Sequence, residues 1–234
     1  MIGGRAGWRA RFDSSQVMRL DPAGLPFIGG ALLLAIVSAA AIAWALALPS
    51  VGLAASLLFL VLAGFFVFFF RDPERTAPAG DDVVLSPADG RVLVAGPAIA
   101  GAAPAGSWTQ ISIFLSPMDV HVNRIPASGR VTKVAYTPGR FLPAYRLDAG
   151  TANERSEIWI DHNGQTIVAR QIVGLLARRV VCRAKTGEAV RAGERYGIMK
   201  FGSRMDIFLP PTADIKVQVG QTVRGGETVI AVLH

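Results

Sequence analysis

Two long apolar stretches near the N-terminus constrain the fold of this 234-residue chain more than any other feature. Residues 27–48 and 51–70 contain no charged side chain, and each is about as long as a helix that crosses a bilayer. Pro49 and Ser50 lie between the two stretches and predict a tight, uncharged turn. We therefore expect a transmembrane helical hairpin at residues 27–70.

A pair of buried core helices and a cleavable signal peptide are the alternatives to a membrane hairpin. Residues 65–70 are apolar on every side and lack the amphipathic period of a helix at the edge of a soluble core. The first stretch begins too far along the chain for a signal peptide, and no small-residue cleavage site is followed by a polar sequence. Both observations favour the hairpin.

Positive charge flanks the two stretches and is absent from the connection between them. Because basic residues stay on the cytoplasmic side, both ends of the hairpin are expected there. This predicts a basic cytoplasmic segment at residues 1–26 and a location in the cell (inner) membrane. The flanking arginines are Arg5, Arg9, Arg11, Arg19, Arg71 and Arg75.

The net charge of +7 indicates which partners a chain like this can bind. It fits a protein held against anionic lipid head groups. Nucleic acid is the competing partner, but the arginines are scattered and form no basic stripe interleaved with aromatic residues. We expect a lipid surface and no nucleic acid. The single Cys182 cannot form an internal disulfide, and it is expected to be a buried small residue in a reducing compartment.

The remainder of the chain has the pattern of β-strands. Residues 71–80 form a polar link with prolines, and residues 81–234 alternate short β-branched runs with Gly, Pro and Asp turns. No long segment has helical period, so an all-β soluble domain of sandwich or barrel type is expected. The expected strands cover residues 83–85, 91–95, 110–115, 130–136, 156–161, 165–171, 179–184, 196–201, 205–209, 215–219 and 228–233.

Two internal repeats refine this expectation. Residues 187–194 resemble residues 220–227 in a Gly-x-x-Val-x-x-Gly-Glu pattern, and residues 87–92 resemble residues 126–131. Glycines at these spacings permit tight hairpins, while the valine fills the core. The first pattern is common in barrel-sandwich domains that carry biotin or lipoyl groups, so a barrel-sandwich-like fold is expected. The glycines are expected to serve the fold rather than a site.

A glycine–serine pair between two strand-like runs is the chain's most reactive feature. If Ser203 Oγ attacks the carbonyl carbon of Gly202, the amide becomes an ester. Elimination of that ester leaves dehydroalanine, which hydrolyses to a pyruvoyl group. Such a group forms an imine with a substrate amine and accepts electrons from a breaking bond. A plain turn is the alternative, but no polar cluster surrounds the pair.

Asp89 and His121 are the candidate acid and base for this serine. His121 lies in a polar segment bordered by prolines, whereas Asp89 precedes a glycine in what also reads as a simple turn. The order Asp89, His121, Ser203 supplies an acid, a base and a nucleophile. Order alone does not show that they meet, and a structural histidine remains the alternative for His121. His162 is expected in an exposed hairpin turn.

Several short motifs occur together in one order and give the chain a family resemblance. They are Phe-Arg-Asp-Pro-Glu-Arg at 70–75, Ser-Pro-Ala-Asp-Gly at 86–90, Ser-Pro-Met-Asp-Val-His at 116–121, Asn-Glu-Arg at 153–155, Ala-Arg-Arg-Val-Val-Cys at 177–182 and Phe-Gly-Ser-Arg at 201–204. From the hairpin to its end, the chain resembles phosphatidylserine decarboxylase in its short bacterial and archaeal-type form.

The resemblance implies a proenzyme that cuts itself between Gly202 and Ser203 into a large β chain and a small α chain. Ser203 would become a pyruvoyl group, which forms a Schiff base with the serine head group of the lipid. In longer members, the segment matching residues 116–126 carries two histidines. The first matches His121, and the second falls on Arg124. Either His121 serves both cleavage and decarboxylation or another base drives cleavage, while Asp89 keeps its match.

The anionic head group of such a substrate would need cationic partners. The candidates are Arg140, Arg155, Arg178 and Arg179. No metal site is predicted, and the sequence leaves room for a homo-oligomer of the processed heterodimer.

Two other functions are compatible with parts of the sequence. A membrane-anchored carrier or adaptor of barrel-sandwich type is the first, because Met199-Lys200 loosely resembles a biotin-accepting motif. Phe201 replaces the second methionine of that motif, and the long coiled-coil hairpins of adaptors are missing. A membrane serine hydrolase is the second, and the absence of a Gly-x-Ser-x-Gly sequence argues against it.

Overall fold

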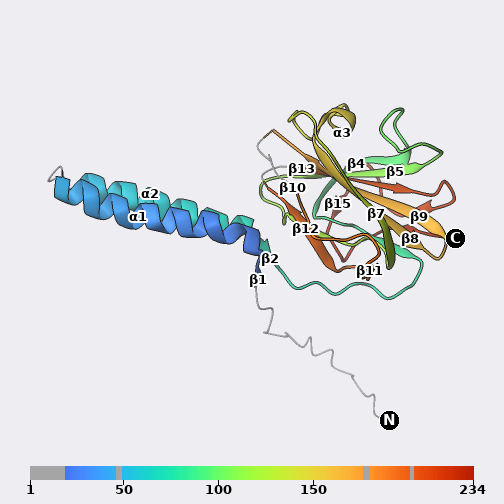
Figure 1. The fold of residues 1–234 in the computed structure, drawn as a ribbon, viewed down its shortest axis with the longest axis horizontal. Coiled ribbons are helices and arrows are strands. Elements are labelled where there is room, and N and C mark those ends of the chain that lie inside the picture. Colours follow the sequence, from blue (N-terminus) through green and yellow to red (C-terminus); the bar gives the residue numbers. More distant parts are fainter. Residues whose placement is uncertain (1–18, 46–48, 176–179, 201–202) are drawn as a thin grey trace, which may run out of the picture.

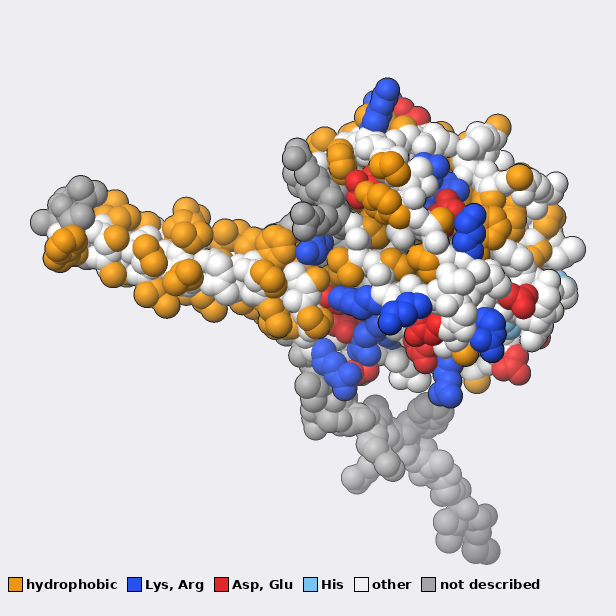
Figure 2. All heavy atoms as spheres, viewed as in Figure 1, with side chains coloured by type: hydrophobic (Ala, Val, Ile, Leu, Met, Phe, Trp, Pro, Cys, Tyr) orange, Lys and Arg blue, Asp and Glu red, His pale blue; other side chains and the backbone are white. Residues whose placement is uncertain are grey.

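The computed structural model describes residues 19–45, 49–175, 180–200 and 203–234, and shows a helical rod joined to a β-rich body (Figure 1). Helices α1 (Leu25–Ala45) and α2 (Pro49–Phe69) run side by side along the rod. Hydrophobic side chains cover the rod (Figure 2), and both helices are long and apolar enough to cross a membrane. A short 3₁₀ helix, Pro22–Gly24, precedes them.

The turn predicted at Pro49 and Ser50 is wrong, because both residues belong to the first turn of α2. Proline is favoured at the start of a helix, where its missing N–H has no intrahelical partner to lose. Residues 46–48, between the two helices in the sequence, lie outside the described part of the chain.

An eight-stranded antiparallel sheet forms most of the body. Its order is β11-β7-β8-β9-β13-β5-β4-β15, and no pairing among the described strands closes it into a barrel. Two three-stranded sheets, β10-β12-β6 and β14-β16-β3, accompany it, and β1 pairs with β2 beside the helical rod. The large sheet contains β4 (Gly90–Pro97), β5 (Thr109–Leu115), β7 (Gly129–Thr137), β8 (Arg155–His162), β9 (Gln165–Val173), β11 (Ala189–Val190), β13 (Ser203–Leu209) and β15 (Thr222–Val223). The others are β1 (Arg19–Leu20), β2 (Arg71–Asp72), β3 (Val83–Leu85), β6 (Val122–Arg124), β10 (Val180–Cys182), β12 (Arg195–Met199), β14 (Asp214–Ile215) and β16 (Val229–Val232), with helix α3 at Ala149–Ala152.

The predicted architecture of β-sheets preceded by two apolar helices is confirmed in this coarse form. The expected kinship with biotinyl-type domains is not confirmed by the sheet topology and stays a prediction. Strand β13, which begins at the predicted nucleophile Ser203, is central in the large sheet, between β5 and β9. Its odd-numbered residues Met205 and Ile207 pack in the main core, so Ser203 faces the same side.

The two internal repeats pair with each other across the sheet. Val190 lies opposite Gly129, and Val223 lies opposite Gly90, so each Gly-x-x-Val segment edges one Gly-Arg-Val strand. The backbone bonds match as well, because Gly187 N–H donates to Val131 and Gly220 N–H donates to Val92. Both valines are buried, which confirms that the repeats are structural.

Candidate active site

Ser203 is buried at the start of β13 and faces the core. Its backbone lies opposite Leu115 of β5 and Val173 of β9. The side chain has no exposed surface, and Oγ has no hydrogen-bond partner among the described residues. Buried polar atoms are normally paired, so an unpaired nucleophile in the middle of a sheet suggests a functional rather than a structural role. Gly202 lies outside the described residues.

His121 occupies the segment between β5 and β6 and is fully buried. Its Nδ1 lies 2.9 Å from the carbonyl oxygen of Asp119. Because a carbonyl only accepts, Nδ1 carries the proton of the neutral ring, and Nε2 is the basic nitrogen. Burial lowers the pKa of His121 to about 4, the Asp119 hydrogen bond opposes this shift, and nearby Arg71 reinforces it. The imidazole is therefore neutral at pH 7.

Backbone bonds place His121 and Ser203 at the two ends of one short segment. Met199 N–H donates to the carbonyl oxygen of His121 at 3.3 Å, and residue 203 pairs with the end of β5. Four peptide units separate residues 199 and 203, so their Cα atoms are at most about 14 Å apart. The fold thus brings the predicted base and nucleophile into one region.

The end of the helical rod forms part of the same region. The ring of Phe69, the last residue of α2, lies 4.2 Å from the His121 ring between centroids, and Phe69 is fully buried. Phe69 and Phe70 form one apolar cluster with Val120 and Val122 on either side of the histidine. Arg71 then donates to the Met118 carbonyl at 2.6 Å. The rod is packed against the site and not merely tethered to it.

Asp89 is held by groups other than the predicted histidine. Arg75 Nη2 lies 2.9 Å from Asp89 Oδ2, and Gly225 N–H donates to Oδ1 at 2.7 Å. No hydrogen bond or ion pair joins it to His121 within the described part of the chain. Burial raises the pKa of Asp89, although the Gly225 N–H and Arg75 both oppose the shift. The acid, base and nucleophile therefore do not form one hydrogen-bonded chain here.

Arg124 holds the segment that leaves the rod. It is 5% exposed, and its guanidinium reaches Asp72 Oδ1 at 3.1 Å and the Pro73 carbonyl at 2.8 Å. Arg195 also pairs with Asp72, so this carboxylate lies between two cations. The residue at the place of the second family histidine thus has a clear structural role.

The predicted substrate arginines do not gather at Ser203. Arg155 projects from the opposite face of the sheet, where it borders a cavity of about 340 Å³ together with Glu157 and Arg170. Arg140 is exposed, and its backbone pairs with that of Asn153. Arg178 and Arg179 lie outside the described residues.

A completely buried arginine, which was not among the residues predicted for the site, follows the nucleophile. Arg204 forms two bonds to Asp206, of 2.6 and 3.1 Å, and a third to Ser112 Oγ at 3.0 Å. The alternation of Arg and Asp along β13 is the sequence signal that could have predicted this pair. The pair lies on the opposite face of the sheet from Ser203 and anchors the start of the strand.

His162 differs from its prediction as an exposed turn residue. It ends β8, is 5% exposed, and its Nδ1 lies 2.7 Å from the Ser128 carbonyl, while Asn163 and Gly164 form the turn. Cys182 is half-buried on β10.

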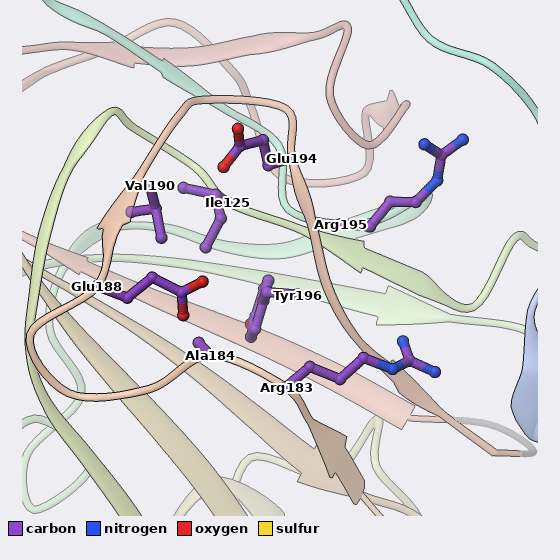
Figure 3. Close-up of a pocket in the computed structure, with 8 residues that line it drawn as sticks. All are labelled: Ile125, Arg183, Ala184, Glu188, Val190, Glu194, Arg195 and Tyr196. Atoms are coloured by element: carbon purple, nitrogen blue, oxygen red, sulfur yellow. The ribbon is translucent and has the colours of Figure 1, made fainter.

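A second, smaller cavity of about 110 Å³ contains none of the predicted site residues (Figure 3). Glu188, Glu194 and Tyr196 border it, and the guanidinium groups of Arg183 and Arg195 point away from the glutamates. These arginines pair instead with acidic residues at the base of the rod, Arg183 with Asp21 and Arg195 with Asp72 and Glu74. This cavity is a structural junction and not the candidate active site.

Comparison with known proteins gives one consistent family. The sequence model of the phosphatidylserine decarboxylase family matches residues 62–231. A protein named phosphatidylserine decarboxylase proenzyme from Pelodictyon phaeoclathratiforme is 46% identical over 167 residues, 71% of this chain and 78% of its own. The protein of that name from Granulibacter bethesdensis is 43% identical over 215 residues, 90% of this chain and 84% of its own. One from Ehrlichia ruminantium is 46% identical over 183 residues, 76% and 79% of the two chains.

Proposed function

The chain belongs to the phosphatidylserine decarboxylase family, and we infer that it converts phosphatidylserine to phosphatidylethanolamine in phospholipid biosynthesis. The observation that carries this inference is the family match over residues 62–231, which contains Asp89, His121, Gly202 and Ser203. The alignments with this chain span most of the length of relatives that are named proenzymes. We therefore extend the inference to processing of this chain into two chains.

Self-cleavage at Gly202–Ser203 would generate the reactive group from the chain itself. Ser203 Oγ bonds to the carbonyl carbon of Gly202, the C–N bond breaks, and the nitrogen of residue 203 takes up the proton. Loss of the Cα proton of residue 203 then breaks its Cβ–Oγ bond, which frees a carboxylate at residue 202. Water replaces the amine of the resulting dehydroalanine, releases ammonia and leaves a pyruvoyl group. The unpaired, buried Oγ of Ser203 supports this role.

The pyruvoyl group supplies an electrophilic carbonyl that can withdraw electrons from a bound amino acid. The surroundings of residue 203 fit such a small group, because β5 and β9 shield it on both sides and the core lies beneath it.

His121 is the candidate to move the proton that replaces CO₂ on the substrate carbon. Its Nδ1 is fixed by Asp119, so Nε2 is the nitrogen that exchanges this proton. A pKa near 4 leaves it neutral until substrate arrives. The negative phosphate of a lipid head group would raise that pKa and favour the protonated, donating form.

The two chains would remain associated after cleavage as a heterodimer. Strand β13 begins at Ser203 and is hydrogen-bonded on both edges, so the small chain supplies the centre of the large sheet. Asp89 and Arg75 of the large chain also bind Gly225 and Glu227 of the small chain. Separation would expose the core on both pieces.

The helical rod would hold this site at the surface of the membrane that contains the substrate. We propose the division 1–26 cytoplasmic segment, 27–70 hairpin, 71–80 link and 81–234 catalytic domain, with the catalytic domain on the cytoplasmic face. Charge around the hairpin supports this orientation. Arg140, Arg155, Arg178 and Arg179 stay predictions for head-group binding.

Activity is tested with carboxyl-labelled phosphatidylserine in detergent micelles. The purified chain should release labelled CO₂ and form phosphatidylethanolamine, whereas Ser203→Ala should release none. Ser107→Ala, at an exposed serine, serves as the matched control and should retain full activity. Full activity in Ser203→Ala would exclude residue 203 as the source of the reactive group.

A further inference from the structure

Two buried amides lie on the same side of the large sheet as Ser203, and neither belongs to the predicted site. Gln171 is 1% exposed on β9, and Asn123 is fully buried on β6. Gln171 Nε2 donates to Asn123 Oδ1 at 2.8 Å, which bridges the large sheet to the sheet that contains β6. We call these two residues the amide pair.

Strand register places Gln171, one member of the amide pair, next to the nucleophile. Ser203 lies opposite Val173, and Gln171 lies opposite Met205, so Gln171 and Ser203 are diagonal neighbours on one face of the sheet. Diagonal neighbours are within reach of a long side chain. Asn123 is also only two residues from His121 in the chain and is bonded to Gln171, so the amide pair lies in the region that contains the predicted base and the nucleophile.

The remaining polar atoms of the amide pair have no partner in the described part of the chain. Asn123 Nδ2 is an unpaired donor, and Gln171 Oε1 is an unpaired acceptor. The orientation of the Gln171 amide is supported by the Val181 carbonyl, which can only accept and lies 3.4 Å from Nε2. Leaving both atoms buried and unpaired costs free energy, so a purely structural bridge would be an inefficient arrangement.

The space around the amide pair is kept open by a glycine. A Cβ atom at Gly197 would lie 2.7 Å from Gln171 Nε2 and would also collide with the Val181 carbonyl. Gly197 lies opposite Asn123 in the pairing of β12 with β6. Any side chain at position 197 would therefore displace the Gln171 amide, and glycine leaves room for it.

The unpaired atoms complement the hydroxyl of Ser203. A serine hydroxyl donates one hydrogen bond and accepts others, and Ser203 Oγ is itself unpaired. Its O–H matches the acceptor Gln171 Oε1, and its lone pairs match the donor Asn123 Nδ2. We propose that the amide pair positions Ser203 for self-cleavage, by engaging its hydroxyl when the serine rotates towards Gln171 and Asn123. This inference rests on the proposed function.

Two variants distinguish the role of the unpaired Asn123 N–H from the role of the hydrogen bond between Gln171 and Asn123. Asn123→Asp retains an acceptor for Gln171 Nε2 and removes the free N–H. The double variant Asn123→Leu/Gln171→Met replaces both amides by apolar groups of similar shape, a change that can leave a fold as stable as before or more so. Asn163→Asp, in the exposed turn after β8, is the control for the introduced charge.

Chain splitting is followed by mass after a short pulse of synthesis of the full-length protein. Both amide variants should split about 10²-fold more slowly than the parent and Asn163→Asp, the loss expected from a misplaced reacting group. The same changes in a Ser203→Ala background give melting temperatures of uncut protein. The double variant should melt no lower than its parent, because only function has been removed.

Splitting of the double variant at the parental rate overturns the proposal. So does slow splitting that is matched by a lowered melting temperature in both variants, since the amide pair would then be structural. If the double variant does not fold, Asn123→Asp alone decides by the same criteria. Failure of the proposed function is distinguishable, because the parent protein itself would then neither split nor release CO₂.

Discussion

The ring of Phe69 lies 4.2 Å from the ring of His121, which joins the end of a membrane-length helix to the predicted catalytic base. A hairpin that served only as an anchor would not need this contact. The buried phenylalanine contributes to the apolar surroundings that lower the pKa of the histidine. The rod and the chemistry are therefore expected to depend on each other.

Phe69→Ala should reduce decarboxylation about tenfold on soluble short-chain phosphatidylserine as well as on vesicles, because it leaves a void beside the imidazole. Leu58→Ala, at an exposed position of α2 (66% exposed), is the control and should change neither rate. Initial rates of CO₂ release on the two substrates measure the effect. A loss confined to vesicles would show that Phe69 acts only through membrane binding.

Arg75→Gln should lower the free energy of unfolding by about 3 kcal/mol, because it leaves Asp89 and Glu227 without their shared, mostly buried cation. Arg224→Gln removes an arginine that is 73% exposed and 3.9 Å from Glu227, and should cost less than about 0.5 kcal/mol. Chemical unfolding of both variants in the Ser203→Ala background gives the comparison. Equal losses of unfolding free energy in the two variants would show that the ion pairs of Arg75 with Asp89 and Glu227 contribute no more than an exposed pair.

Much of this fold could be predicted from the sequence because its signals are local. The apolar stretches, the alternating strands and the paired repeats each show a pattern within about 20 residues. Strand β6 was missed because Asn123 and Arg124 are buried polar residues, which a hydrophobic pattern cannot indicate. His162 was assigned to the turn because the carbonyl of Ser128 that holds it is 34 residues away.

The site could be predicted only in part for the same reason. Its nucleophile and base have local motifs, but many contacts around them join segments that are distant in the sequence. Arg75 meets Glu227 across 152 residues of sequence, and Gln171 meets Asn123 across 48. The expected link between Asp89 and His121 was inferred from the order of these residues in the sequence. In the structure, Asp89 instead binds Arg75 and Gly225.

Folding stability should fall as the pH drops from about 6.5 to about 4, and His121→Gln should flatten this fall. An unfolded histidine binds a proton below pH 6.5, whereas folded His121 does so only below about 4. Between these values the unfolded state holds more protons, so stability increases with pH. The contribution is about 3 kcal/mol. Unfolding of both proteins across this range tests it, and parallel curves would show that His121 is not buried in neutral form.

His121→Ala should slow both chain splitting and CO₂ release if one residue serves both steps, because Arg124 occupies the place of the second family histidine. General acid–base help is worth about 10²- to 10⁴-fold. His162→Ala loses a buried bond to Ser128 and should lower stability without changing either rate. Splitting is followed on a gel, and CO₂ release is measured on the cleaved fraction. Normal splitting with lost decarboxylation would restrict His121 to the second step, and two normal rates would make it a core residue.

The central claim is that Ser203 becomes the reactive group through cleavage of its own chain. Intact mass under denaturing conditions tests this most directly. We expect two polypeptides: residues 1–202, and a fragment from position 203 whose mass and blocked N-terminus match a pyruvoyl group. Ser203→Ala should remain one chain. A purified, active wild-type protein that remains a single 24.8 kDa chain would show that Ser203 does not become the reactive group by cleavage.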